Sequence, residues 1–313
     1  PLVPGRFVYG PVGGGVRVPW RLARYLGLRG IAYEAVRELA RLLGRYLNPL
    51  ARLAWRRADV ILAQNPETVR WLPRRHRARA HVFPNALVAL DELPPPPGPR
   101  TATDRVALFV GRLLPWKGGA IALEVIARAP DWRLAVIGDG PDRRRLERLA
   151  RRRGVAERVE FRGWQQRDEV WRVMREEASI LLFPSLHDEA GWAVVEALSN
   201  GLPVLCLDHG GPPVVAHAAC GPAGSARTAR TVIPSLPELG DRAFLLFGVG
   251  RGASSLATSM QPIGTGQHPL SAVVPTHLLR PPQRLSTRTE GEQHASGVGV
   301  PGAFGNPSTG SPS

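Results

Sequence analysis

The sequence predicts an α/β protein built on doubly wound, Rossmann-type parallel sheets. Short apolar runs alternate with longer amphipathic segments between about residues 101 and 217. The runs are apolar throughout, which is typical of strands covered on both faces. Because one helical segment separates each run from the next, the strands are expected to be parallel and joined by right-handed crossovers.

Each strand of this region is predicted from a run of aliphatic residues, and each helix from apolar residues spaced by three and four. The predicted pairs of strand and helix are, in chain order, "RVALFVG" and "GAIALEVIARA", "WRLAVIGDG" and "DRRRLERLARRRG", "RVEFRG" and "RDEVWRVMREE", and "ASILLFPS" and "GWAVVEALSNG". The run "PVLCL" is the last predicted strand.

Residues 1–90 predict a second, less regular α/β segment. The segment "GRFVYGPVGGG" is a strand that enters a glycine-rich loop, and "ADVILAQN" and "HVFPNA" are further strands. A helical pattern from about residue 31 to residue 57 places Arg37, Arg41 and Arg45 on one ridge. This ridge is interpreted either as a surface that rests on an anionic membrane or as a solvated helix face, and the second interpretation is favoured.

Composition divides the chain into four predicted segments. They are an incomplete Rossmann-like domain (1–90), a proline-rich linker (91–100), a second Rossmann-like domain (101–219) and a low-complexity tail (220–313). The tail loses all periodicity, which predicts little structure and fits a disordered or a frameshifted segment. The chain starts at Pro1 without an initiator methionine, so we expect it to be a fragment.

The formal net charge of +15 favours an anionic partner, such as a phosphorylated ligand, a membrane surface or a nucleic acid. A basic nucleic-acid-binding module is therefore the rival hypothesis. It is disfavoured because the arginines are spread through the chain, without a recognition helix or a set of stacking aromatics. Cys206 and Cys220 lack a metal-ligand spacing, so we expect buried thiols, a cytoplasmic location and no metal.

Ligands of a doubly wound sheet bind beyond the carboxyl ends of its strands. Lys117, the only lysine of the chain, lies there between a predicted strand and a pair of glycines, with Arg112 five residues before it. Two cations at a helix N-terminus make a pocket for a phosphate or diphosphate. The alternative, an exposed residue at the start of a helix, is equally well supported by the residues alone.

Two further loops lie at the same predicted edge. "GDGP" resembles a dinucleotide fingerprint only weakly, because Arg143 stands where the third glycine belongs. In "HDEAGWAVVEA", acidic residues precede Gly191, which starts a helix that carries Glu196. Carboxylates there can bind sugar hydroxyls and helix-start amides can face a phosphate, whereas a solvated Glu196 is the alternative.

Together these stretches resemble the motifs of the retaining GT-B glycosyltransferases of family four, the group 1 glycosyltransferases. The matching stretches are "GRLLPWKG", "IGDGP", "PSLHDEAGWAVVEA" and "GLPV", in order, over residues 101–215. The likeness over residues 1–90 is more diffuse and rests on "GPVGGG", "ADVILAQN" and "FPNA". The resemblance as a whole implies a GT-B fold of two Rossmann-like domains. The N-terminal domain, on the acceptor side, is incomplete, and the C-terminal domain, which binds a nucleotide sugar, is truncated.

The resemblance also implies residue roles. Arg112 and Lys117 hold the donor diphosphate, and together with Asp188, an acid near the transferred sugar, they are the implied catalytic residues. The implied donor-binding set is Gly111, Arg112, Lys117, Gly163, Trp164, Asp188, Glu189, Ala190, Gly191, Trp192 and Glu196. Within this set Glu196 accepts from the ribose, Gly163 and Trp164 lie by the nucleobase, and the amides from Ala190 to Trp192 lie beside the sugar.

Two departures from the family pattern affect this set. The family has Glu where Asp188 stands, so Asp188 and Glu189 both remain candidates for the first acidic role. The family's Phe is Ala190 here, and bulk returns at Trp192.

The implied reaction moves a sugar, of hexosyl type, from a nucleotide-diphosphate donor to a hydroxyl acceptor with retention of configuration, in cell-surface polysaccharide or glycolipid synthesis. The implied partners are the nucleotide sugar and the acceptor, including a lipid-linked one at the inner membrane face, with no cofactor, no metal and no nucleic acid. We expect the 313-residue chain to be inactive through truncation. The sugar, nucleobase, acceptor and oligomeric state do not follow from the sequence.

Overall fold

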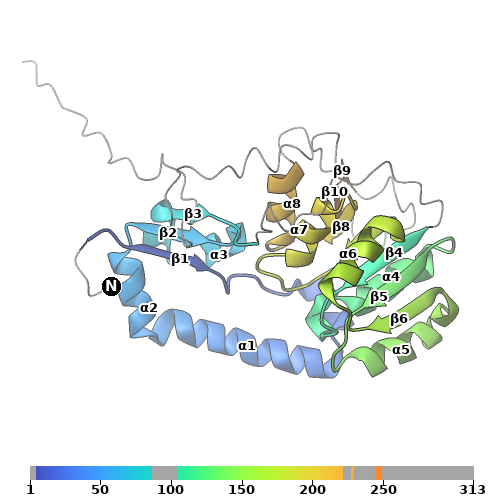
Figure 1. Cartoon of the computed structure of the whole chain (residues 1–313). Coiled ribbons are helices and arrows are strands. Elements are labelled where there is room, and N and C mark those ends of the chain that lie inside the picture. Colours follow the sequence, from blue (N-terminus) through green and yellow to red (C-terminus); the bar gives the residue numbers. More distant parts are fainter. Residues whose placement is uncertain (1–4, 87–104, 221–226, 229–243, 248–313) are drawn as a thin grey trace, which may run out of the picture. The chain divides into compact units, whose positions relative to one another are not determined.

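The computed structural model describes residues 5–86, 105–220, 227–228 and 244–247 (Figure 1). All of them lie in the first of two compact units, residues 1–261 and 262–313. The predicted linker, residues 91–100, lies outside the described residues.

The described residues form two sheets. The strands are β1 (Val8–Val12), β2 (Val60–Ala63), β3 (Ala80–Val82), β4 (Val106–Val110), β5 (Arg133–Ile137), β6 (Val159–Gly163), β7 (Ile180–Phe183), β8 (Val204–Leu207), β9 (Arg227–Thr228) and β10 (Phe244–Phe247). The larger sheet has the order β6-β5-β4-β7-β8-β10-β9, and its strands from β6 to β8 are parallel. The smaller sheet is parallel, with the order β1-β2-β3.

The α-helices are α1 (Gly27–Leu47), α2 (Pro49–Arg57), α3 (Pro66–Trp71), α4 (Gly119–Arg128), α5 (Arg143–Arg152), α6 (Arg167–Glu176), α7 (Trp192–Ser199) and α8 (Pro212–Cys220). Short 3₁₀ helices are η1 (Trp20–Tyr25), η2 (Arg74–Arg79), η4 (Pro115–Lys117) and η5 (Ala156–Arg158). No helix among the described residues combines the length and the apolar character needed to cross a membrane.

The larger sheet is doubly wound, as predicted. Alternate residues of β4 enter two separate cores, with Ala107 and Phe109 on one face and Leu108 on the other. The first core packs against α4 and α5, and the second against α6, α7 and α8. Burial on both faces explains why the strands are apolar without alternation.

The smaller sheet has a compact core of its own. Its fully or nearly fully buried side chains are Trp55, Ala58, Ile61 and Leu72. The ring of Trp55 lies edge-on to that of Trp71, with 5.7 Å between the ring centroids.

The helix predicted over about residues 31–57 begins earlier and is interrupted. Asn48 has an extended backbone, and its Oδ1 accepts hydrogen bonds from the amides of Leu50 and Ala51 at 3.0 and 3.1 Å. Pro49 follows at the first position of α2, where its missing N–H costs nothing. Asn48 therefore ends α1 and caps α2, a break that the apolar periodicity does not reveal.

Two of the three arginines of the predicted ridge, Arg37 and Arg41, do not form the solvated or membrane-facing surface considered from the sequence. Arg37 and Arg41 are only 16% and 10% exposed, and they form ion pairs with Glu34 and Glu38 on the same helix. Arg37 also donates to the carbonyl oxygen of Val16 at 2.7 Å. Their guanidinium groups pair with carboxylates one turn earlier on the same helix, and the carbonyl of Val16 holds Arg37 against the rest of the fold.

The sequence predicts little structure after residue 220, and β10 is an exception. The apolar stretch Phe244–Phe247 pairs antiparallel with all four residues of β8, and β9 pairs with β10. Pairing of this kind covers the backbone groups of β8 that would otherwise form the edge of the sheet. The other residues of the predicted tail lie outside the described part of the chain.

Candidate functional site

The loops that follow β4, β5, β6 and β7 lie at one edge of the larger sheet, because these strands are parallel neighbours. Backbone hydrogen bonds join three of the loops. The amide of Gly111 donates to Ile137, that of Leu113 donates to Asp139, and that of Gly138 donates to Gly163, at 2.7 to 3.0 Å. The stretches that the sequence analysis singled out as motifs are therefore held together at this edge.

Glycines allow the loops to approach closely. Gly118 has a left-handed backbone with φ of 80°, and a Cβ added there would lie 2.0 Å from the carbonyl oxygen of Pro184. The amide of Leu186 also donates to the carbonyl of Trp116 at 2.7 Å. The β4–α4 loop is thus packed against the β7–α7 loop at the point where Lys117 lies.

Lys117 and Asp188 form an ion pair across these two loops. The Nζ atom of Lys117 lies 2.6 Å from Oδ2 of Asp188, and the side chains are 28% and 11% exposed. The ammonium also lies 5.9 Å from the ring centroid of Phe183. Lys117 is therefore not the freely solvated residue at a helix start that one interpretation of the sequence allowed.

Asp188 also organises the start of α7. Its Oδ1 accepts from the amides of Gly191 and Ala190 at 2.8 and 3.3 Å. Two of the amides that the sequence analysis assigned to the sugar or phosphate are therefore bound by Asp188. The amides of Trp192 and Ala193 lie in the first turn of α7, where a helix offers no internal acceptor.

Glu196 lies on α7 with a poorly paired carboxylate. Burial raises the pKa of Glu196 above its ordinary value, and the charge of Arg167 opposes that rise only in part. The Nε atom of Arg167 is 3.5 Å from Oε1 of Glu196. A half-buried carboxylate of this kind can accept hydrogen bonds from the hydroxyls of a ligand.

The carboxylate of Glu189 binds other residues than the carboxylate of Asp188 does. Its Oε2 accepts from Nδ2 of Asn65 at 2.7 Å and from the hydroxyl of Thr68 at 3.3 Å. Its Oε1 lies 3.5 Å from the amide of Val16. Glu189 therefore binds the segment that carries the smaller sheet, whereas Asp188 binds Lys117.

Hydrogen bonds outweigh burial at Glu189. Burial raises its pKa, but hydrogen bonds from His187, Asn65 and the amide of Gly14 lower it, and the pKa lies below its ordinary value. The carboxylate is consequently ionised at neutral pH and stabilises the fold in that form.

We predict that Glu189→Gln lowers the free energy of unfolding at pH 7 by about 1–3 kcal/mol, because Asn65 and Thr68 lose a charged acceptor. A lowered folded-state pKa stabilises the fold above the ordinary pKa of Glu, and this contribution is lost as the pH falls through the folded-state value. Urea unfolding from pH 7 to pH 3 measures the effect. The difference between wild type and variant should shrink toward acid pH, and a constant difference would contradict the role given to ionised Glu189.

Asn65 and Thr68 were not identified from the sequence as site residues. Both are fully buried, and Asn65 caps α3 by accepting from the amide of Thr68 at 2.9 Å. The motif "NPET" carries the signal of a helix N-terminus with proline at its first position. That signal predicts the cap, but it does not predict that the same amide side chain reaches Glu189.

Gly210 and Gly211 were also not identified from the sequence as residues that support the site. A Cβ on Gly211 would lie 2.0 Å from the carbonyl oxygen of Glu189, and the Gly211 amide donates to the carbonyl of Asp188 at 3.0 Å. The β8–α8 loop therefore packs against the backbone of both Asp188 and Glu189. The pair of glycines after a predicted strand was a visible signal for such a close approach.

The remaining predicted residues lie at the same edge of the sheet with exposed side chains. Arg112 follows β4, is exposed, and forms no ion pair with any described residue. Gly163 ends β6 with φ of 73°, and Trp164 after it is 69% exposed. Trp192 opens α7 and is about half exposed. Their placement fits a surface that contacts a ligand.

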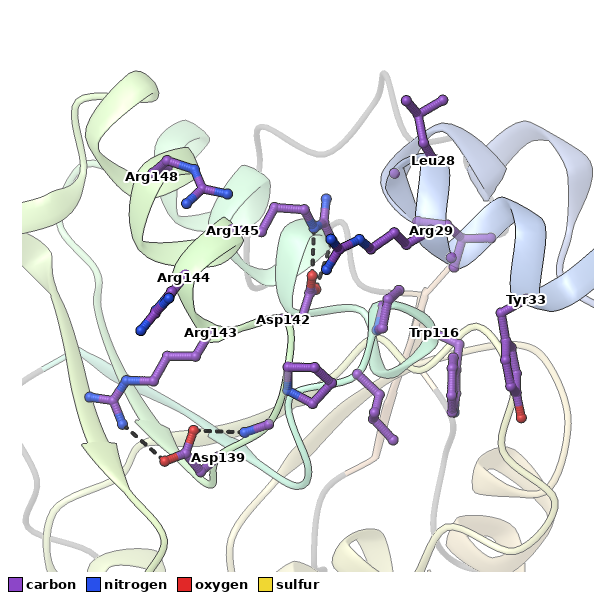
Figure 2. Close-up of a pocket in the computed structure, with 17 residues that line it drawn as sticks. Leu28, Arg29, Tyr33, Trp116, Asp139, Asp142, Arg143, Arg144, Arg145 and Arg148 are labelled. Carbon is purple, nitrogen blue, oxygen red and sulfur yellow. Dashed lines mark hydrogen bonds and ion pairs between the residues drawn. The ribbon is translucent and has the colours of Figure 1, made fainter.

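A basic pocket of about 1000 Å³ lies beside the GDGP loop, and no residue of the predicted donor-binding set lines it. Figure 2 shows the pocket between the start of α1, with Leu28 and Arg29, and the start of α5. The rings of Tyr33 and Trp116 stack at its side, with 4.4 Å between the ring centroids.

The ion pairs of this pocket account for only part of its charge. Arg145 pairs with Asp142 at 2.6 Å and Arg143 with Glu147 at 2.9 Å. Arg144 and Arg148 are exposed and form no ion pair with the described residues. The pocket is therefore cationic, and neither Lys117 nor Asp188 lines it.

In the described ranges there is no group of three or more His, Cys, Asp or Glu residues arranged to hold a metal ion. Cys206 is a free, buried thiol whose pKa is raised by burial, as expected of an inert core cysteine.

The fold and the site define a doubly wound α/β protein with a cation at the ligand-binding edge of its sheet. Residues 95–222 match the family described as glycosyl transferases group 1. This match confirms the predicted resemblance over these residues.

Similar proteins agree with this assignment. One is a 2-deoxystreptamine N-acetyl-D-glucosaminyltransferase of Streptomyces fradiae, 30% identical over 196 residues, which are 58% of this chain and 46% of the relative. Another is the lipopolysaccharide core biosynthesis glycosyltransferase LpsE of Rhizobium meliloti, 34% identical over 107 residues, which are 34% of this chain and 31% of the relative. The chain thus spans less than half the length of either relative.

A solved structure supports the fold. Sucrose-phosphate synthase from Thermosynechococcus elongatus superposes with a TM-score of 0.50 at 20% identity, covering 68% of this chain and 55% of that one. The predicted fold class, parallel-sheet α/β of the GT-B type, is confirmed.

Proposed function

We propose that this chain binds a nucleoside-diphosphate sugar at the carboxyl edge of the larger sheet, as the donor-binding part of a glycosyltransferase. The observation that carries the proposal is the position of the only lysine. Lys117 lies between β4 and α4, and Asp188 of the neighbouring loop holds its ammonium at 2.6 Å. A cation fixed at the edge where parallel sheets bind ligands suits the phosphates of such a donor.

Three groups would bind the diphosphate. The Lys117 ammonium supplies a compact charge, the exposed Arg112 guanidinium supplies a planar fork, and the first-turn amides of α7 supply neutral donors. These groups would stabilise the negative charge that develops on the departing nucleotide as the bond to the sugar breaks. Asp188, close to Lys117, would orient that ammonium and lie near the transferred sugar.

The nucleoside would be bound further along the same edge. Glu196, with its raised pKa and weak pairing, would accept from ribose hydroxyls, and the exposed Trp164 beside Gly163 would lie along the nucleobase. Glu189 is not given a donor-binding role, because Asn65, Thr68 and Val16 already occupy its carboxylate.

The acceptor is proposed to be a hydroxyl of a saccharide or glycolipid, and the transfer is proposed to be hexosyl transfer with retention of configuration. The order of the four motifs supports retention, and the name of the LpsE relative, with its lipopolysaccharide core, supports a saccharide or glycolipid acceptor. No resident cofactor or metal has a part in the proposal.

The test is calorimetric titration of the 313-residue chain with UDP, GDP and ADP and with the glucose derivative of each. We expect one of the three nucleotides to bind saturably with a 1:1 ratio, at physiological salt. The rival hypothesis of a nucleic-acid-binding module predicts no such preference, but binding to single-stranded DNA that weakens steeply with salt. Absence of saturable binding to all six compounds would refute the proposal.

A further inference from the structure

Helix α1 has its polar face turned inward and its apolar face turned outward, the reverse of an ordinary surface helix. The inward positions carry the ion pairs of Arg37 with Glu34 and of Arg41 with Glu38. No apolar side chain of α1 is buried, because the only buried residue of this helix is Gly30. Six exposed apolar side chains lie on the outward face of α1 and at the start of α2. We call this set the outer stripe: Leu28, Val36, Leu39, Leu43, Leu47 and Leu50.

The members of the outer stripe follow helical spacing and are strongly exposed. Leu28 is 88% exposed, Val36 and Leu47 are 69% exposed, and Leu50 is 73% exposed. The 21 residues of α1 extend about 31 Å at 1.5 Å per residue. A continuous apolar surface of this length is typical of an interaction site rather than of scattered surface leucines.

The charges around the outer stripe are of one sign. From Trp20 to Arg57 the chain has nine arginines and two glutamates. Both glutamates are bound in ion pairs with arginines and are no more than 25% exposed. Seven arginines of this segment form no ion pair among the described residues, namely Arg21, Arg24, Arg29, Arg45, Arg52, Arg56 and Arg57.

Aromatic residues mark both ends of the stripe. Trp20 is 81% exposed at the N-terminal end, with the guanidinium of Arg21 5.5 Å from its ring centroid. Tyr46 is about half exposed at the other end, with the guanidinium of Arg45 at 5.4 Å. Tryptophan and tyrosine next to cations are the residues that proteins place at the boundary between lipid tails and headgroups.

We propose that the outer stripe lies on an anionic lipid surface, with its leucines among the acyl chains and the surrounding arginines among the headgroups. The pocket at the N-terminal end extends this surface. Leu28 and Arg29 line it together with the exposed Arg144 and Arg148 (Figure 2), so lipid phosphates would find further cations there.

Charge complementarity selects this occupant over others. A second copy of the chain would place one arginine rim against another, and like charges at that distance are unfavourable. Residues 221–313 carry seven arginines against four acidic residues, so they too are basic. An anionic surface satisfies the apolar stripe and the cationic rim together.

The test is flotation of the 313-residue chain with phosphatidylcholine vesicles and with vesicles that contain phosphatidylglycerol. We expect binding only to the second kind, weakened by salt. The double variant Leu39→Gln, Leu43→Gln should reduce the partition coefficient about tenfold or more, since each leucine loses its apolar contact. Arg29→Gln with Arg52→Gln, both exposed, should reduce it roughly fivefold for each charge removed.

Matched controls change the same chemistry elsewhere. Val82→Gln removes an exposed apolar side chain on β3, and Arg151→Gln with Arg152→Gln removes two exposed charges on α5; neither should change binding. Circular dichroism and sedimentation velocity are recorded for each variant. Failure of the wild type to float with anionic vesicles would overturn the proposal, as would a wild-type dimer that the leucine variant dissociates.

A second measurement does not depend on losing leucines. A fluorophore attached to Leu47→Cys, in a Cys220→Ser background, should shift its emission to the blue when anionic vesicles are added. The same fluorophore at Val82→Cys should not respond, and buried Cys206 is protected from labelling. An equal response at both positions would contradict docking through the outer stripe.

Discussion

Gly118→Ala is expected to destabilise the protein by about 4 kcal/mol or more, combining left-handed backbone strain of about 1–2 kcal/mol with a steric clash. The φ of Gly118 is 80°, and the new Cβ would lie 2.0 Å from the carbonyl oxygen of Pro184. That oxygen belongs to the backbone, so it cannot rotate away as a side chain would. Chemical denaturation measures the change.

Gly154→Ala is the matched control. Gly154 also has a positive φ, 68°, but a Cβ there would meet nothing within 4 Å. Its variant should therefore lose only the strain of about 1–2 kcal/mol. Equal losses in the two variants would mean that the contact between the β4–α4 loop and Pro184 is not needed.

Lys117→Ala is expected to weaken binding of the preferred nucleoside diphosphate by about ten- to a hundredfold, the effect of losing a charged hydrogen bond. The variant removes a cation and also leaves the mostly buried Asp188 without its partner at 2.6 Å, so a carboxylate would face the phosphates. Calorimetry of the variant against the wild type measures the change.

Lys117→Arg and Arg151→Ala complete the comparison. Lys117→Arg keeps the charge but replaces a compact ammonium with a planar fork, so an intermediate affinity is expected. Arg151→Ala removes an exposed cation from the end of α5 and should leave the affinity unchanged. Unaltered affinity in Lys117→Ala would remove this residue from the proposed site.

Most of the larger sheet and its helices could be predicted from the sequence because the local signals agree. Strands such as β4 and β7 are short aliphatic runs, and the intervening helices have clear apolar spacing. The position of the loops at one edge then follows from parallel topology alone.

Features that depend on long-range contacts could not be predicted. The spacing of three residues between each glutamate and its arginine on α1 is visible in the sequence, but nothing local reveals that Val16 lies on that side of the helix and accepts from Arg37. In the same way, Asp188 and Glu189 are adjacent in the chain, and only the packing of Lys117 and Asn65 distinguishes them.

The hydrogen bonds of Glu189 have a consequence for how the protein assembles. Among the described residues, the smaller sheet has only four buried side chains in its own core, and a core this small gives little stability. Asn65 and Thr68, next to this sheet, donate hydrogen bonds to the carboxylate of Glu189 in the β7–α7 loop. The buried carboxylate in turn needs these two donors in place of water. Residues 5–86 and 105–220 are therefore expected to gain and lose their native structure in one cooperative step, although each has a separate hydrophobic centre.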